Sequence, residues 1–411
     1  MPAEPGVPSV TPGLTTDGES AAVDDGASLS LVSGDAAYRL QRRIGLIPAK
    51  GLGIGRRLVI LPLVAWLPMA IWAALNHRAL AGAVQEPLLS HYGIHVRCLV
   101  AIPLLLVAEA LAQGVMPKLI PYFVTSGLVP ADCRDRFRQI LSNILVLRDR
   151  WLPWIVILGV AFALSTIDSF RQDIHEVAWA ASDAPAGLRL GFGGWWYLLV
   201  VRPLYVCLIL TWVWRLVLLA ILFWRVSGLP LSLVPTHPDR AGGLAFVERF
   251  AVVFSPVLLA HSAVLSASWA HSVIYHGVEI TALRAEMVAA AILLVVVFAL
   301  PYLSFVRALG HAKREAELEY GVLAGRHGRL VREKWILGKQ VGEPPVLDAP
   351  ELGPVADMVG LYGAVAGMRG LPLGKRGLAM IVLPVVVPML LVAAIQVPVK
   401  DLLMKVLGTL V

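Results

Sequence analysis

The stretch AIPLLLVAEALAQGVM, residues 101–116, is an apolar run with one carboxylate, Glu109, near its centre. It belongs to the segment 98–117, which contains no Lys or Arg. This segment is long enough to cross a bilayer as a helix. A carboxylate at that depth is costly unless it meets a charged partner or water. The stretch therefore predicts a membrane-spanning helix and a polar intramembrane site around Glu109.

The composition of the whole chain points the same way. Of 411 residues, 58% are hydrophobic and 15% are charged, whereas soluble domains contain roughly 25% charged residues. We expect an all-α membrane protein with about seven transmembrane helices and a small cytoplasmic helical layer. The predicted spans are 58–75, 98–117, 151–167, 194–226, 251–275, 286–306 and 378–396.

The seventh predicted span is the least regular. Pro384 and Pro388 interrupt it, and Lys400 and Lys405 follow it. A segment broken by proline can also enter and leave the bilayer on one side. The sequence therefore leaves open whether 378–396 crosses fully or is re-entrant.

Basic residues gather in alternate loops and give the spans a direction. They precede the first span and lie between the second and third, the fourth and fifth, and the sixth and seventh. By the positive-inside rule, the N-terminus is expected to be cytoplasmic. The net charge of +7 fits this distribution. Nucleic acid is not an expected partner, because no soluble stretch combines a basic patch with interleaved aromatics.

The chain divides into four parts. Residues 1–38 are rich in Pro, Gly, Ser, Ala and Asp and are expected to form a disordered tail. Residues 39–306 form a six-span membrane region, and 307–377 a cytoplasmic helical segment that continues the sixth span. Residues 378–411 hold the seventh span and a short tail. Apolar spacing within 132–150 predicts an amphipathic helix at the inner surface or against other cytoplasmic helices.

Glu109 has several candidate partners. Gln113 lies one helical turn away, and Arg202 and Arg215 lie in the fourth predicted span. We expect Glu109 to contact Arg215 or Arg202. Such a contact could belong to an ion or proton pathway, or it could be a structural pair that fixes helix packing. The sequence leaves both interpretations open.

The fifth predicted span carries a second polar face. His261, Ser268, Ser272 and Tyr275 fall roughly on one side of the helix and could line a wet cavity. Small polar residues also allow close helix approach. No span contains His or Glu pairs at metal-ligand spacing, so the sequence predicts no metal site. It predicts no cofactor either.

The segment VPTHPDRAGGL, 234–244, joins the fourth and fifth spans on the basic side. Its prolines end the preceding helix. Asp239 is expected to cap the following helix, and Gly242 and Gly243 to adopt left-handed or closely packed backbone. We interpret it as a polar corner joining the membrane region to the cytoplasmic helices through His237, Asp239 and Arg240.

Seven segments together resemble a family of uncharacterised bacterial multi-span membrane proteins. The most specific are HPDRAGGL (237–244) and DAPELGPVAD (348–357). The resemblance implies a bacterial inner-membrane protein and assigns no activity. The other five segments are IPLLLVAE (102–109), FVTSGLVP (123–130), VLRDR (146–150), MRGLPLGKR (368–376) and VPVKDLLMKVLG (397–408).

Three functions fit these features. The first is a channel or transporter whose path is lined or gated by Glu109, Arg202, Arg215 and His261. The second is a membrane-anchored scaffold or sensor whose cytoplasmic helices bind a protein partner. An intramembrane enzyme acting on lipid ranks last, since no catalytic cluster is evident in the sequence. The expected partners are the lipid bilayer, a second copy of the chain and a cytoplasmic protein.

Overall fold

A computed structural model describes residues 30, 32, 34–48, 53–80, 82, 86–170, 174–182, 189–339 and 353–396. Within these ranges six helical segments are long and apolar enough to cross a membrane, which confirms the predicted all-α membrane fold. They are α3 (Ile54–Leu75), α4–η2–α5 (Tyr92–Thr125), α8–η5–α9 (Phe192–Ser227), η6–α10 (Ala245–Tyr275), α11–η7–α12–η8 (Ile280–Ile336) and α14 (Lys375–Gln396).

Four of these segments are continuous runs of several helical elements. Short π-helical or 3-10 turns join the α-helices without breaking the rod. Their parts are α4 (Tyr92–His95), η2 (Val96–Ala101), α5 (Ile102–Thr125), α8 (Phe192–Trp196), η5 (Tyr197–Val201), α9 (Arg202–Ser227), η6 (Ala245–Phe250), α10 (Ala251–Tyr275), α11 (Ile280–Ala299), η7 (Leu300–Phe305), α12 (Val306–Val331) and η8 (Arg332–Ile336).

Among the remaining elements, α6 and α7 are helices of 16 and 20 residues that pack against α9, and the others are shorter. The two strands form a two-residue antiparallel pair between loops. These elements are α2 (Ala36–Arg43), η1 (Leu88–Ser90), η3 (Ala131–Cys133), α6 (Arg134–Asp149), α7 (Trp151–Phe170), η4 (Ile174–Ala180), β1 (Ala181–Ser182), β2 (Arg189–Leu190) and α13 (Gly353–Ala366).

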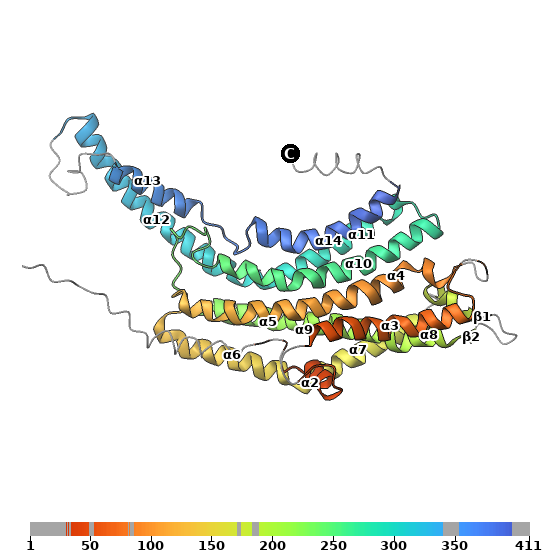
Figure 1. Cartoon of the computed structure of the whole chain (residues 1–411). Helices are drawn as coiled ribbons and strands as arrows, with labels where there is room; N and C mark the ends of the chain where they lie inside the picture. Colours follow the sequence, from red (N-terminus) through yellow and green to blue (C-terminus); the bar gives the residue numbers. More distant parts are fainter. Residues whose placement is uncertain are drawn as a thin grey trace, which may run out of the picture.

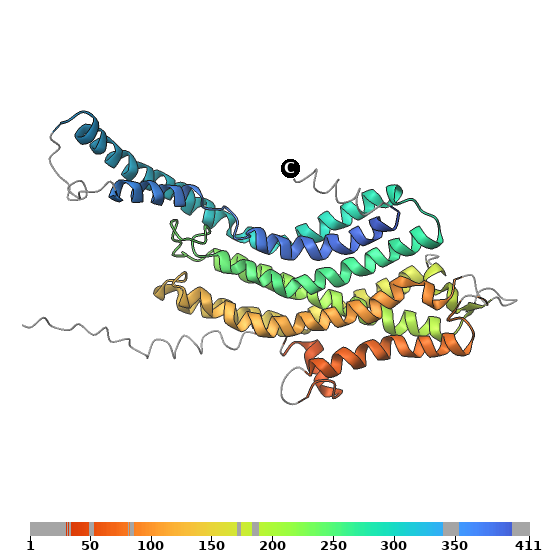
Figure 2. The same cartoon turned by 45° about the horizontal axis from the view of Figure 1, so that its top comes forward.

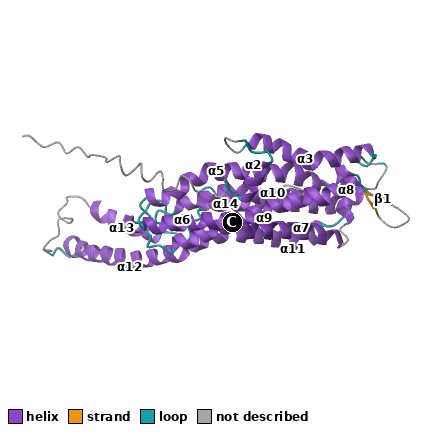
Figure 3. Ribbon diagram, turned by 90° about the horizontal axis from the view of Figure 1, so that it is seen from below, coloured by secondary structure: helices purple, strands orange, loops and turns teal. Residues whose placement is uncertain are grey.

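The bundle is elongated, and its helices run close to one long axis (Figure 1). The helix α10 is central: 61% of the apolar stretch of the segment Ala245–Tyr275 is buried inside the protein, against 22% of that of α3. Seen from below, α3 and α11 lie on opposite sides of the bundle (Figure 3). The outward faces of such helices are apolar, as on α11 with Ile292 and Leu293 exposed. Contact with lipid explains that pattern.

The predicted second and fourth spans are longer in the structure than a bilayer requires. The segment Tyr92–Thr125 has 34 residues and Phe192–Ser227 has 36, lengths of about 50 Å or more at 1.5 Å per residue. The second span was expected to end at 117, but α5 continues through Pro117 and Pro121. The extra length of α9 packs against α6, in agreement with the amphipathic helix predicted there.

Two further predictions concern the number of spans. The predicted third span corresponds to α7, a 20-residue helix. Its side chains are described only as far as Leu164, and this part is among the shorter apolar helices. The predicted seventh span corresponds to α14, which continues through Pro384 and Pro388 and is long enough to cross.

The cytoplasmic segment predicted for 307–377 has a simpler form than a bundle. The helix of the sixth span continues as α12, and α13 packs back along it. Together they form a two-helix arm that projects from one end of the molecule (Figures 1 and 2). Lys313 Nζ donates to the backbone carbonyls of Ala366 and Met368, and this ties the end of α13 to α12.

Candidate functional site

Four charged side chains meet in the interior around Glu109. Arg57 Nη2 donates to Glu109 Oε2 at 2.6 Å, and Arg215 Nη1 and Nη2 both lie 3.1 Å from Oε1. Arg215 Nη2 also donates to Asp35 Oδ2 at 2.7 Å. None of the four side chains is more than 4% exposed. We call Asp35, Arg57, Glu109 and Arg215 the charge cluster.

The formal charges of this cluster cancel, because two carboxylates face two guanidinium groups. Removing charges from water costs several kcal/mol per ion, and only close pairing offsets it. The cluster nevertheless keeps spare donors: Arg57 Nε and Nη1 and Arg215 Nε make no hydrogen bond with the described residues. Buried polar atoms of this kind are where ordered water is usually found.

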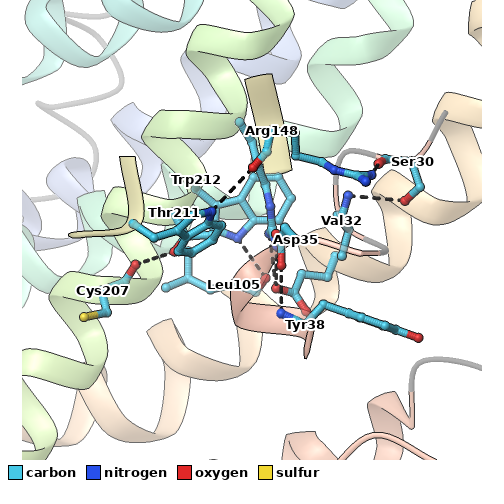
Figure 4. A network of polar contacts seen from close by, with 12 residues as sticks. Ser30, Val32, Asp35, Tyr38, Leu105, Arg148, Cys207, Thr211 and Trp212 are labelled. Carbon is cyan, nitrogen blue, oxygen red and sulfur yellow. Dashed lines mark hydrogen bonds and ion pairs between the residues drawn. The ribbon is translucent and has the colours of Figure 1, made fainter. Parts of the chain in front are cut away.

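Asp35 enters the cluster from the N-terminal segment. It is the N-cap of α2, and its Oδ1 accepts a hydrogen bond from the Tyr38 N–H at 2.7 Å (Figure 4). Arg148 of α6 donates to the Ser30 carbonyl nearby. The tail predicted to be disordered to residue 38 is therefore ordered at Asp35 and in the first turn of α2; residues 1–29 lie outside the described ranges.

The cluster lies near one end of the first span rather than at mid-depth. Arg57 is in the first turn of α3, so Glu109 is level with the start of that helix. Glu109 was expected near the middle of its span. It is indeed central in Tyr92–Thr125, but that helix is longer than the bilayer requires, so its centre is displaced from the centre of α3.

The expected contact between Glu109 and Arg215 is present, while the functional role assigned to it stays a prediction. Arg202, the alternative partner, is half-buried at the first position of α9. Gln113 is half-buried on α5. Of the predicted partners of Glu109, the structure shows Arg215 bonded to its carboxylate.

A second polar layer lies farther along the same helices. Arg97 is 9% exposed, and its guanidinium lies 5.5 Å from the ring centres of both Tyr197 and Tyr205. The Tyr205 hydroxyl is 3.0 Å from His261 Nδ1. From Glu109 to Arg97 the helix rises about 18 Å, and α3 is about 33 Å long. Arg97 therefore lies about halfway along the first span.

Sequence reasoning missed the depth of Arg97. The predicted second span starts at Cys98, where the uninterrupted apolar run begins, and therefore leaves Arg97 just outside it. The structure starts the helix at Tyr92, which places Arg97 inside it.

A cavity of about 240 Å³ lies between residues 91–97 and the C-terminal part of α10, and Arg97 is one of its lining residues. It is near the end of the bundle opposite the α12–α13 arm, which we call the outer end. Two histidines, His91 and His271, stand at its wall with ring centres 4.9 Å apart. Ser268, predicted to line a polar face, is one of its lining residues. The full lining is His91, Gly93, Ile94, Arg97, Val264, Leu265, Ser268 and His271.

His91 is neutral at physiological pH. Burial, followed by the neighbouring His271, lowers the pKa of His91 to about 4. Glu86 acts in the opposite direction but does not overcome these effects. The imidazole therefore presents a nitrogen lone pair rather than a positive charge.

A second cavity of about 570 Å³ lies near the other end of α9. Its wall carries the exposed arginines Arg136, Arg225 and Arg307 together with Trp224. From Tyr205, beside the outer cavity, to Trp224 the helix rises about 28 Å. The charge cluster on α5 and α9 lies between the two cavities.

The polar corner is organised by Asp239. Its Oδ1 accepts hydrogen bonds from the N–H groups of Ala241 at 2.8 Å and Gly243 at 3.2 Å, and Oδ2 accepts from Ala245, the first residue of η6, at 3.0 Å. Desolvation would raise the pKa of Asp239, but these backbone hydrogen bonds outweigh it and lower that pKa. The predicted capping role is therefore present in the structure.

The corner also joins the membrane region to the segment after α13. The corner contributes backbone carbonyl groups to this contact rather than the predicted side chains. Arg369 donates from its N–H to the Arg240 carbonyl at 2.7 Å and from Nη2 to the Asp239 carbonyl at 2.9 Å. His237 Nδ1 lies 2.9 Å from Asp239 Oδ1. Arg240, with φ +56°, Gly242 and Gly243 have left-handed backbone, as predicted for the two glycines.

The chain matches no protein-family model, no curated protein and no solved structure. Its function is therefore inferred from its own residues. These residues define a multi-pass helical membrane protein with a compensated charge cluster, a cavity whose lining includes two histidines and a buried arginine, and a projecting helical arm.

Proposed function

We propose that this protein is a channel or transporter for a small anionic solute, located in a bacterial inner membrane with its N-terminus in the cytoplasm. The observation that carries the proposal is the cavity of about 240 Å³ with Arg97 at its inner end. A buried arginine inside a span is costly, and such residues typically mark solute or ion paths. Its positive charge and fixed fork of donors favour an anion.

The position of the charge cluster supports this proposal. A path from the outer cavity to the arginine-lined cavity would pass the packed layer that contains Glu109 and Arg215. The spare donors on Arg57 and Arg215 give that layer polar groups that an ion or water could use. The cluster would then act as the closed gate between the cavity that contains Arg97 and the arginine-lined cavity.

Flux in proteoliposomes tests the proposal. Purified protein is reconstituted with a chloride-sensitive dye inside, and the same preparation is assayed for uptake of radiolabelled phosphate. We expect flux of at least one of these anions above that of empty liposomes, and at least a tenfold reduction by Arg97→Gln. Arg284→Gln, an exposed arginine of α11, is the matched control and should retain flux.

Equal anion flux in protein-containing and empty liposomes would contradict the proposal. So would a preparation in which Arg97→Gln and Arg284→Gln have the same flux as the unaltered protein. Arg97→Lys keeps the charge and should retain more flux than Arg97→Gln. Circular dichroism and gel filtration show whether each variant is folded.

The alternative function is a membrane-anchored scaffold or sensor, and the projecting arm favours it. On α12 the apolar side chains of Leu318 and Val322 are 73% and 70% exposed and lie one helical turn apart. A cytoplasmic protein partner could cover this face. Deletion of 315–370 should then abolish partner recruitment while membrane insertion persists; anion flux that survives the deletion would separate the two functions.

A further inference from the structure

Three donor atoms converge at the outer end of the bundle, beside the cavity. His271 Nε2 lies 3.4 Å and His91 Nε2 3.8 Å from Glu86 Oε2. All three ligand atoms lie within 4.8 Å of one another. They come from two distant parts of the chain, the segment before α4 and the C-terminal part of α10.

These atoms face one another without bonding. Distances of 3.4 and 3.8 Å are longer than hydrogen bonds between N and O, which are 2.7–3.2 Å. None of Glu86 Oε2, His91 Nε2 and His271 Nε2 has a hydrogen-bond partner among the described residues. The side chains are largely buried, with 20%, 4% and 13% exposed respectively. Three buried polar atoms therefore point at a common place.

The chemistry of the surroundings makes these atoms acceptors. His271 Nδ1 lies 3.1 Å from the Ser90 carbonyl oxygen. A carbonyl only accepts, so Nδ1 carries a proton, and Nε2 is the ring nitrogen that faces Glu86. The Glu86 carboxylate is a second acceptor, and His91 Nε2 is a third buried atom, 3.8 Å from Glu86 Oε2. One water molecule can donate only two hydrogen bonds, whereas one cation can satisfy all three groups.

We propose that Glu86, His91 and His271 bind a divalent transition-metal cation of borderline softness, with Zn²⁺ the best match. Two imidazoles and one carboxylate form a ligand set that Zn²⁺ uses with a fourth position left for water. Ligands about 2.1 Å from a tetrahedral ion lie about 3.4 Å apart, so His91 must approach by several tenths of an ångström. The hydrogen bond from His271 Nδ1 to Ser90 is the outer-shell contact expected of a zinc-binding histidine.

The sequence predicted no metal site because no single span contains His or Glu pairs at the spacing of metal ligands. In the structure, the segment before α4 contains Glu86 and His91, and α10 contains His271. A bound ion would clamp this segment onto α10 at the wall of the outer cavity. The inference is independent of the anion proposal, because metal binding is measured without any flux.

The test is a Zn²⁺ titration of the full-length protein in detergent, stripped with EDTA and followed by competition with a chromophoric chelator. We expect one Zn²⁺ per chain with a dissociation constant in the micromolar range or below. Glu86→Gln, His91→Gln and His271→Gln should each weaken binding at least tenfold. His311→Gln is the matched control, since His311 pairs with one carboxylate, Glu315, on the exposed face of α12.

X-ray absorption on the unaltered protein provides a second measurement that does not depend on the folding of any variant. It should show nitrogen and oxygen ligands at 2.0–2.1 Å, including two imidazoles. Absence of stoichiometric binding would overturn the proposal. So would a spectrum without imidazole ligands, or binding that His311→Gln weakens as much as the three proposed ligands do. Because flux plays no part in this test, the site can fail while the transport proposal stands, and the reverse.

Discussion

The charge cluster and the group of Glu86, His91 and His271, which we call the histidine cluster, lie at different levels of the bundle and satisfy their polar atoms differently. Around Glu109, opposite charges are paired at 2.6 to 3.1 Å. Around Glu86, three groups approach to between 3.4 and 4.8 Å without bonding. Both places bury polar atoms. The first balances its charges within the protein chain, and the second has the composition of a site that an added cation would complete.

The comparison teaches that burial alone does not identify a binding site. Glu109 was the most conspicuous residue in the sequence, yet its charge is balanced by neighbours in the same chain. The less conspicuous His91 and His271 each have a buried Nε2 without a hydrogen-bond partner among the described residues. Compensation by protein groups indicates stability, whereas converging unsatisfied acceptors indicate a ligand.

The largest expected effect comes from breaking the charge cluster. Glu109→Gln leaves two buried guanidinium groups with one carboxylate, and the free energy of unfolding should fall by about 3–5 kcal/mol. Thermal unfolding in detergent measures it, with Glu319→Gln on the exposed arm as control. Adding Arg57→Met to Glu109→Gln should recover part of the loss. A loss below about 1 kcal/mol for Glu109→Gln would show that the cluster contributes little.

A smaller effect is expected at the edge of the same cluster. Asp35→Asn removes one ion pair with Arg215 but leaves Glu109 in place, so we expect a loss of about 1.5–3 kcal/mol. The N-terminal segment should also become accessible to a protease at lower temperature than in the unaltered protein. Asp132→Asn, at an exposed position, is the control. Unchanged protease sensitivity would show that Asp35 does not hold this segment.

The polar corner should respond to acid. Asp239→Ala removes three backbone hydrogen bonds, and the expected loss is about 0.5–2 kcal/mol at pH 7. Because the folded-state pKa of Asp239 is lowered, its contribution is complete above the ordinary carboxyl pKa of about 3.9. It is lost as pH falls through the folded pKa. The difference in stability between the two proteins should therefore shrink at pH 3 relative to pH 7; an equal difference would exclude the ionised carboxylate as its cause.

The smallest effect is expected at the histidine cluster without metal. His91→Phe keeps the ring beside His271, and its Nε2 has no hydrogen bond to lose. After EDTA treatment the free energy of unfolding should change by about 1 kcal/mol or less. With Zn²⁺ present the unaltered protein alone should gain stability. Equal stabilisation of both proteins by Zn²⁺ would place the ion elsewhere.

The sequence predicts the helices well because the period and length of apolar runs follow directly from the bilayer. The fifth predicted span has the bounds of α10, and the long fourth span and the extension of the sixth are present. The Glu109–Arg215 contact was also expected, since charges inside spans have few partners. These predictions depend on local pattern and on pairing within the membrane.

The features that the sequence did not predict depend on how distant segments fold together. Asp35 was assigned to a disordered tail by composition, yet one carboxylate that finds Arg215 is enough to order its neighbourhood. Arg57 and Arg97 were counted as loop residues because each stands next to an apolar run. No regular sequence spacing relates Glu86, His91 and His271. Only the packing of α10 against the segment before α4 brings them together.

The hydrogen bond between Asp35 and Arg215 joins residues 180 positions apart. During translation at about 5–20 residues per second, Arg215 emerges roughly 10 to 35 s after Asp35. In that interval Glu109 and Arg57 can already pair, since both precede Arg215. The N-terminal segment thus completes the cluster only after the fourth predicted span has been inserted. Asp35 is therefore synthesised before the other three residues of the cluster. It can bond to Arg215 only after that residue, the last of the four, has been made.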